Sequence, residues 1–247
     1  MTLCKFGEEY LKKARARPLG TPVLEALQII KKHLYPKAQL PQEPLVVREI
    51  SQEEAISDSH IGPGRGGVCL LSGEIVLVKG LWCLKVPIHE TLHKISSVRN
   101  LEEALILRPL FEGLAECLTG YLLHRSYEHV YSKCWRPDSK EFLCHKSYEA
   151  NCRLWGAFFH FVPIESIIPL YFEFPADWKR MCETFADRVN QNGYKAFRDV
   201  LGGILSSSPP VTDQTFRNEC EDVFGKRFTV YCRTPLALDF SNVIRLS

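Results

Sequence analysis

Apolar residues recur every three or four positions in the first part of the chain, a spacing typical of a helix with one buried face. Thr21 and Pro22 are predicted to be the N-cap and the first residue of this helix, which is expected to end near Tyr35. Its apolar stripe is predicted to consist of Leu24, Leu27, Ile30 and Leu34. The basic and polar residues 1–20 before it are expected to form a loosely attached arm or a short helix.

Shorter apolar runs that are rich in β-branched residues predict strands in the next part of the chain. One strand is expected within residues 44–50. Residues 68–71 and 74–78 predict a β-hairpin that is closed by the two-residue turn Ser72-Gly73. Together these strands are expected to form a small mixed sheet whose last strand lies at the edge of a cleft.

Two polar segments separate the predicted strands. Residues 51–59 are expected to be a solvent-facing connection. The glycine-rich residues 62–67 resemble a phosphate-binding loop only superficially. They lack its lysine and hydroxyl residue, and a strand rather than a helix follows, so no nucleotide site is predicted.

Helical spacing dominates the chain from about residue 85 onward. Pro87 fits the first turn of a helix that ends near Ser97. A second helix is expected to begin near Asn100, and Pro109 is predicted to break or restart it. The sequence therefore predicts an α+β fold, with a sheet subdomain at about residues 21–98 and a mostly helical subdomain at about residues 99–247.

The first of these helices carries His89-Glu90-Thr91-Leu92-His93. Two histidines four residues apart lie on one face of a helix, so both rings can reach a single ion. Neutral imidazole is a good ligand for zinc. Glu90 points in another direction, where it can take a proton from a water on the metal.

A catalytic zinc site needs a third protein ligand and an open fourth position. Glu112 supplies this ligand eighteen residues after His93, a spacing that allows the chain to turn and return on a second helix. Glu116, one turn further on, is predicted to accept the other ring N–H of His89, the alternative being a solvated glutamate. Two histidines and a carboxylate also suit iron.

The pattern His-Glu-x-x-His-x18-Glu resembles that of the gluzincin metallopeptidases, most closely the branch that contains aminopeptidase N. In that branch the third ligand lies in an Asn-Glu-Gly-Phe-Ala type motif, which here reads Phe-Glu-Gly-Leu-Ala. The stretch that begins at Tyr148, Tyr-Glu-Ala-Asn, is similar to the family's Tyr-Glu-Lys-Gly motif, in which the lysine and glycine differ. No convincing Gly-x-Met-Glu-Asn stretch is found, which favours an endopeptidase-like relative. The resemblance covers roughly residues 66–225.

The resemblance implies a zincin-like domain over residues 21–247 that hydrolyses peptide bonds. It implies that His89, His93 and Glu112 hold Zn2+, that Glu90 is the general base, and that Tyr148 stabilises the oxyanion. Tyr148 could instead be a packed core tyrosine, and His160 and Tyr171 are further candidates for its role. In gluzincins a strand just before the metal helix binds the substrate backbone, and the predicted hairpin is placed to do the same.

Two alternatives to an active peptidase stay open. The chain could be a catalytically inactive zinc-binding interaction module with the same fold. It could also be a latent peptidase in which the arm at residues 1–17 or the C-terminal tail lies in the cleft.

Composition narrows the partners and the compartment. The net charge of +2 over 247 residues is too balanced to predict nucleic acid or an anionic membrane as a partner. The resemblance to gluzincins implies a peptide or protein substrate. Ten cysteines occur without an N-terminal stretch that resembles a signal peptide. We therefore expect a cytoplasmic protein whose thiols are mostly reduced, and the oligomeric state stays open.

Overall fold

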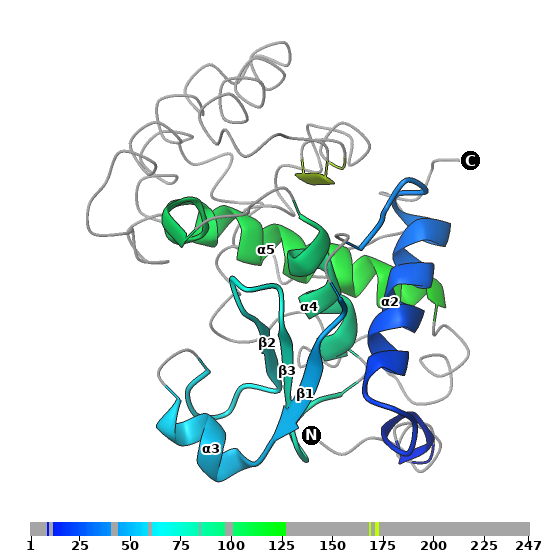
Figure 1. Cartoon of the computed structure of the whole chain (residues 1–247). Helices are drawn as coiled ribbons and strands as arrows, with labels where there is room; N and C mark the ends of the chain where they lie inside the picture. Colours follow the sequence, from blue (N-terminus) through cyan, green and yellow to red (C-terminus); the bar gives the residue numbers. More distant parts are fainter. Residues whose placement is uncertain are drawn as a thin grey trace, which may run out of the picture. The chain divides into compact units, whose positions relative to one another are not determined.

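The computed structural model describes residues 9, 12–40, 44–58, 61–83, 85–96, 101–126, 168, 171 and 172. Its elements follow in the order α2 (Gly20–His33), β1 (Val47–Ile50), α3 (Gln52–Ser57), β2 (Gly67–Cys69), β3 (Ile75–Val78), α4 (Lys85–Ile95) and α5 (Leu101–Ser126) (Figure 1). Helices and one small sheet agree with the predicted α+β class. These elements alone do not identify a zincin-like fold, which stays a prediction.

The chain divides into two compact units. One consists of Met1–Ser96 and Thr119–Ser139, and the other consists of Ser97–Leu118 and Lys140–Ser247. Helix α5 thus contributes its residues up to Leu118 to one unit and those from Thr119 to the other. The subdomain boundary expected near residue 98 stays a prediction.

The three strands form a mixed sheet in the order β1-β3-β2. β1 is parallel to β3, with Val47 opposite Ile75, and β2 is antiparallel to β3, with Val68 opposite Val76. The predicted mixed sheet is therefore confirmed. Within the described sheet β3 pairs on both sides and β2 lies at the edge next to it, whereas the prediction that the last strand edges a cleft stays a prediction.

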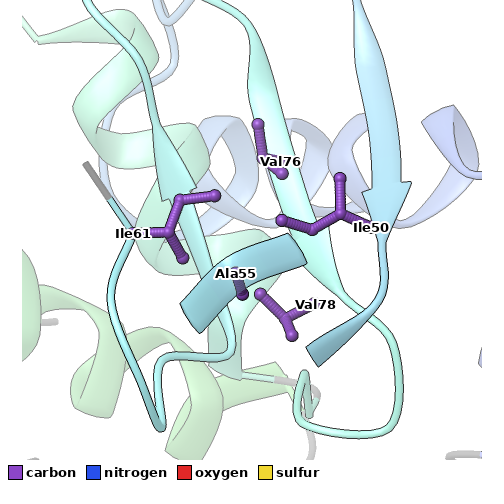
Figure 2. Close-up of a cluster of buried hydrophobic side chains, with 5 residues drawn as sticks. All are labelled: Ile50, Ala55, Ile61, Val76 and Val78. Carbon is purple, nitrogen blue, oxygen red and sulfur yellow. The ribbon is translucent and has the colours of Figure 1, made fainter. Parts of the chain in front are cut away.

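All four residues of β3 are buried, since helices cover both faces of this strand. On one face Ile75 and Leu77 pack with Val23 of α2 and with Trp82, and Val86 of α4 lies against this cluster. Figure 2 shows the opposite face, where the buried cluster consists of Ile50, Ala55, Ile61, Val76 and Val78. A strand that is covered on both faces has a continuous apolar sequence, as the Ile-Val-Leu-Val of β3 does.

The N-terminal helix differs from its prediction in detail. The Thr21 N–H already donates to the Pro18 carbonyl at 2.9 Å, so α2 begins at Gly20 and Thr21 is not its N-cap. Leu24 is 49% exposed, so it does not belong to the apolar stripe. The buried residues of α2 are Pro22, Val23, Ala26, Leu27 and Ile30.

Residues 12–15 before α2 are helical, which favours the short helix over the loose arm. Ala14 is buried there. The Arg15 guanidinium donates to the Trp82 carbonyl and lies 5.2 Å from the centroid of the Trp82 ring. The Trp82 ring N–H in turn donates to Glu49 of β1 at 2.9 Å. The segment before α2 is therefore attached to the loop that leads into α4.

The polar connection expected at residues 51–59 contains the short helix α3. Its N-terminus is a capping box, in which the Glu54 N–H donates to the Ser51 hydroxyl and the Ser51 N–H donates to the Glu54 carboxylate. Ala55 is buried against the sheet. The segment is thus a short helix that is mostly exposed, as expected of a solvent-facing connection, with Ala55 as its buried residue.

The predicted hairpin is confirmed, but its turn has three residues instead of two. The Leu70 N–H donates to the Glu74 carbonyl and the Gly73 N–H donates to the Leu70 carbonyl, both at 2.8 Å. Gly73 has a φ of +79°, which is a left-handed conformation. A three-residue hairpin turn of this kind requires one residue in that conformation.

Helix α4 contains Pro87 in its first turn, as predicted, and ends at Ile95. Helix α5 continues through Pro109, so the predicted break is wrong. A proline in a helix removes one backbone hydrogen bond, and packing can outweigh that cost. Ala115, Leu118 and Leu122, which follow it, are fully buried. No helix within the described residues is long and apolar enough to cross a membrane.

The close approach of β2 to α4 can be tested at Gly67. A Cβ there would lie 2.7 Å from Val86 Cγ1 and 2.8 Å from the Val76 carbonyl oxygen. We expect Gly67→Ala to lower the free energy of unfolding by about 1–3 kcal/mol in urea unfolding experiments. Gly20→Ala is the matched control, since a Cβ there would lie 3.9 Å from Leu45 Cδ2. A Gly67→Ala protein as stable as the wild type would contradict the close approach.

Candidate metal centre

Helix α4 brings the two predicted histidine ligands together. His89 Nε2 and His93 Nε2 lie 3.0 Å apart, and the ring centroids are separated by 4.7 Å. His89 is buried and His93 is half-buried. The i, i+4 spacing therefore places both imidazoles on one face of the helix, as the sequence predicts.

Glu112 of α5 completes a set of three possible ligands. One ligand atom from each of His89, His93 and Glu112 lies within 4.8 Å of the other two. Two nitrogens at about 2.0–2.1 Å from a tetrahedral zinc ion are separated by about 3.3 Å, close to the separation of the two Nε2 atoms. Two imidazoles and one carboxylate therefore fit a divalent metal, and this donor set suits zinc as well as iron.

Glu90 follows His89 directly on α4, and β2 orients its carboxylate. Its side chain is 7% exposed, and its Oε2 accepts a hydrogen bond of 2.7 Å from the Cys69 N–H of β2. A buried carboxylate is costly unless hydrogen bonds compensate for the lost water. The predicted base is therefore held between its own helix and the hairpin.

The direction of the Cys69 N–H follows from the register of the hairpin. The Val78 N–H donates to the Gly66 carbonyl and the Leu70 N–H donates to the Glu74 carbonyl. Because hydrogen-bonded and non-hydrogen-bonded pairs alternate in an antiparallel ladder, the main-chain groups of Cys69 point away from β3. The sequence could not indicate this contact, since any residue except proline provides the same N–H.

The Cys69 thiol itself is not suited to nucleophilic chemistry or to metal binding. Burial, and to a lesser extent the negative charge of Glu90, raise the pKa of this thiol to about 12, while Lys94 acts in the opposite direction. The thiol is therefore protonated at neutral pH, whereas the thiolate is the form that attacks and binds metals.

Glu116 is 1% exposed, so the alternative of a solvated glutamate is wrong. It lies one turn beyond the half-buried Glu112 on α5. A buried carboxylate at this position is compatible with the predicted bond to the other ring N–H of His89, which stays a prediction.

Of the three candidates for oxyanion stabilisation, only Tyr171 is among the described residues. Tyr148 and His160 lie outside the described residues. Tyr171 is 1% exposed and its ring lies 5.3 Å from that of Phe111, the residue before Glu112. The Phe172 ring meets Tyr171 edge-on at 4.9 Å. Tyr171 thus belongs to a buried aromatic cluster, and its proposed catalytic role stays untested.

Comparison of the chain with protein-family models, with curated proteins and with solved structures found no match. The case for a metal centre therefore consists of the residue types, their spacing and their geometry.

Metal binding can be tested by thermal unfolding. A ligand that binds only the folded state at a hundred times its Kd adds about 2.7 kcal/mol to the free energy of unfolding. We expect zinc to raise the melting temperature of the wild type and to have little effect on His93→Ala. His33→Ala, which changes a histidine of α2, is the matched control and should respond like the wild type. An undiminished zinc response in His93→Ala would refute the ligand set.

The burial of Cys69 predicts a pH dependence of stability. Below its ordinary pKa of 9.0 the thiol is protonated in both the folded and the unfolded chain, and its contribution to stability is fully present. Between that pH and about 12, the unfolded chain loses the proton that the folded chain keeps, so the free energy of unfolding falls. In urea unfolding experiments, the free energy of unfolding of Cys69→Ala should fall less than that of the wild type between about pH 8 and about pH 10.5. An equal decline in both proteins would contradict the raised pKa.

Proposed function

We propose that the protein is a zinc-dependent metallopeptidase of the gluzincin type that cleaves peptide bonds within chains. The observation that carries this proposal is that Glu90, which is buried and follows His89 directly on α4, accompanies two imidazoles and a carboxylate that fit one metal ion. A metal site with only a structural role needs no such base, whereas hydrolysis does.

Each of these residues has a distinct role in the proposed reaction. His89, His93 and Glu112 would hold zinc, and three protein ligands leave a position for water or substrate. When bound, zinc supplies Lewis acidity, which lowers the pKa of a water and polarises a carbonyl. Glu90 takes the proton of the attacking water on its carboxylate and returns it to the leaving amine. The Cys69 N–H keeps that carboxylate oriented throughout.

Among the described residues β2 pairs only with β3, and its other edge supports a peptide as the substrate. The main-chain groups of Gly67 and Cys69 point away from β3, toward the space where a further strand would pair. An extended peptide can add to such an edge through main-chain hydrogen bonds. Because the Cys69 N–H is bonded to Glu90, the added strand would use the Cys69 carbonyl and the main-chain groups of Gly67.

The role of Glu90 can be tested by Glu90→Gln. The carboxamide keeps the size of the side chain but cannot act as a base at neutral pH. We expect zinc content to be unchanged. The rate at which a mixed peptide library is cleaved should fall by about a hundredfold to ten-thousandfold. Glu53→Gln on the exposed side of α3 is the matched control and should cleave like the wild type.

Three outcomes separate the possible functions. Undiminished cleavage by Glu90→Gln refutes the assignment of the base. Zinc binding without any cleavage by the wild type favours the inactive interaction module, which the departures from the Tyr-Glu-Lys-Gly pattern at Tyr148 would then explain. Cleavage that appears only after removal of residues 1–17 or of the C-terminal tail favours a latent peptidase.

A further inference from the structure

Two hydrogen bonds connect α4 to the β2–β3 hairpin. The Glu90 carboxylate accepts from the Cys69 N–H, and the Lys94 ammonium donates to the Gly73 carbonyl. Glu90 and Lys94 are one turn apart and so lie on the same face of α4. Of their two partners, Cys69 is the last residue of β2 and Gly73 is the last residue of the hairpin turn. One helix face therefore holds the hairpin at two points, beside the face that carries the histidines.

Lys94 occupies an unusual environment for a lysine. Its side chain is only 6% exposed, although lysine is seldom buried unless its charge has a partner. Ordering a long lysine side chain also costs conformational entropy. An apolar residue at position 94 would avoid both costs, but it could not bind the Gly73 carbonyl. The bond to the hairpin turn is thus the feature that distinguishes a lysine from an apolar residue here.

The contact between Cys69 and Glu90 needs support from outside the sheet. The β2–β3 ladder uses the main-chain groups of Val68, whereas the Cys69 N–H points away from β3. Pairing within the sheet therefore does not fix the distance between the Cys69 N–H and α4. Val86 packs against the sheet and holds α4 close to Gly67 at one end of β2. Lys94 provides the second point, because it binds the turn that follows β2 to the helix that carries Glu90.

We propose that Lys94 is a positioning residue, which holds the β2–β3 hairpin against α4 so that the Cys69 N–H orients the Glu90 carboxylate. The consequence for catalysis rests on the proposed function, whereas the consequence for the hairpin does not. The role proposed for Lys94 involves no metal ligand and no reacting atom, because it acts through Cys69.

Residue-resolved hydrogen exchange of the full chain, measured by NMR, tests the consequence for the hairpin. The Cys69 amide should be protected in the wild type and should exchange about tenfold faster in Glu90→Ala and in Lys94→Met. The Leu70 amide, which bonds to Glu74 within the hairpin, should stay protected in both variants. Lys32→Met, on the exposed side of α2, is the matched control and should leave both amides unchanged.

Lys94→Arg keeps a donor at the end of a long side chain and should keep the Cys69 amide protected. If both amides lose protection in Lys94→Met, the hairpin has opened. The exchange of the Cys69 amide in Lys94→Arg then shows whether the lost donor is the cause. Wild-type protection in the arginine variant supports the proposal. Loss of protection there, or an unchanged Cys69 amide in Lys94→Met, overturns it.

Peptide cleavage provides the second measurement. Displacing a catalytic group by about 1 Å can cost about a hundredfold in rate, so Lys94→Met should lose about ten- to hundredfold in kcat with unchanged zinc content. Lys94→Arg should restore most of this loss. The two proposals fail differently: an inactive wild type with the expected amide exchange refutes the peptidase, and an active Lys94→Met protein with a protected Cys69 amide refutes the role of Lys94.

Discussion

The burial of β3 on both faces is the constraint on which the described sheet depends. A strand without an exposed face needs a cover on each side, and α3 provides one while α2 and α4 provide the other. Ile88 and Leu92 of α4 are also fully buried. The helix that carries the two histidines is therefore part of the hydrophobic core, which fixes its position more firmly than a surface helix would be fixed.

That position has an energetic cost, because α4 buries polar residues as well as apolar ones. His89, Glu90, Thr91 and Lys94 are all buried. The structure compensates with specific hydrogen bonds: Thr91 donates to the Pro87 carbonyl, Glu90 accepts from Cys69, and Lys94 donates to Gly73. Burial of so many polar groups on one short helix departs from the usual pattern of a core, and such departures are expected at functional sites.

The features that follow from local periodicity could be predicted from the sequence. The spacing of His89 and His93 predicts their shared helix face, and the run from 74 to 78 predicts the second hairpin strand. The break at Pro109 was a wrong prediction because the local preference of proline does not account for the packing of the residues after it. The helix at α3 was missed although Ser51 and Glu54 form a capping box that the sequence contains.

Other features had no local pattern that could reveal them. The bond between Cys69 and Glu90 involves a main-chain N–H, so it depends on the hairpin register and not on the identity of a side chain. The burial of Glu116 depends on tertiary packing, since its position on the helix alone allows either a solvated or a buried carboxylate. Tyr148 lies outside the described residues, so its resemblance to a catalytic tyrosine stays a prediction.

The two strands that pair with β3 lie at different distances from it along the chain. β2 reaches β3 through a three-residue turn, whereas β1 is separated from β3 by α3 and β2. The conformational entropy lost on closing a loop increases with its length, so less is lost in forming the hairpin than in adding β1. The part of the sheet that presents the Cys69 N–H to Glu90 is thus the part that the chain can close at the lowest entropic cost.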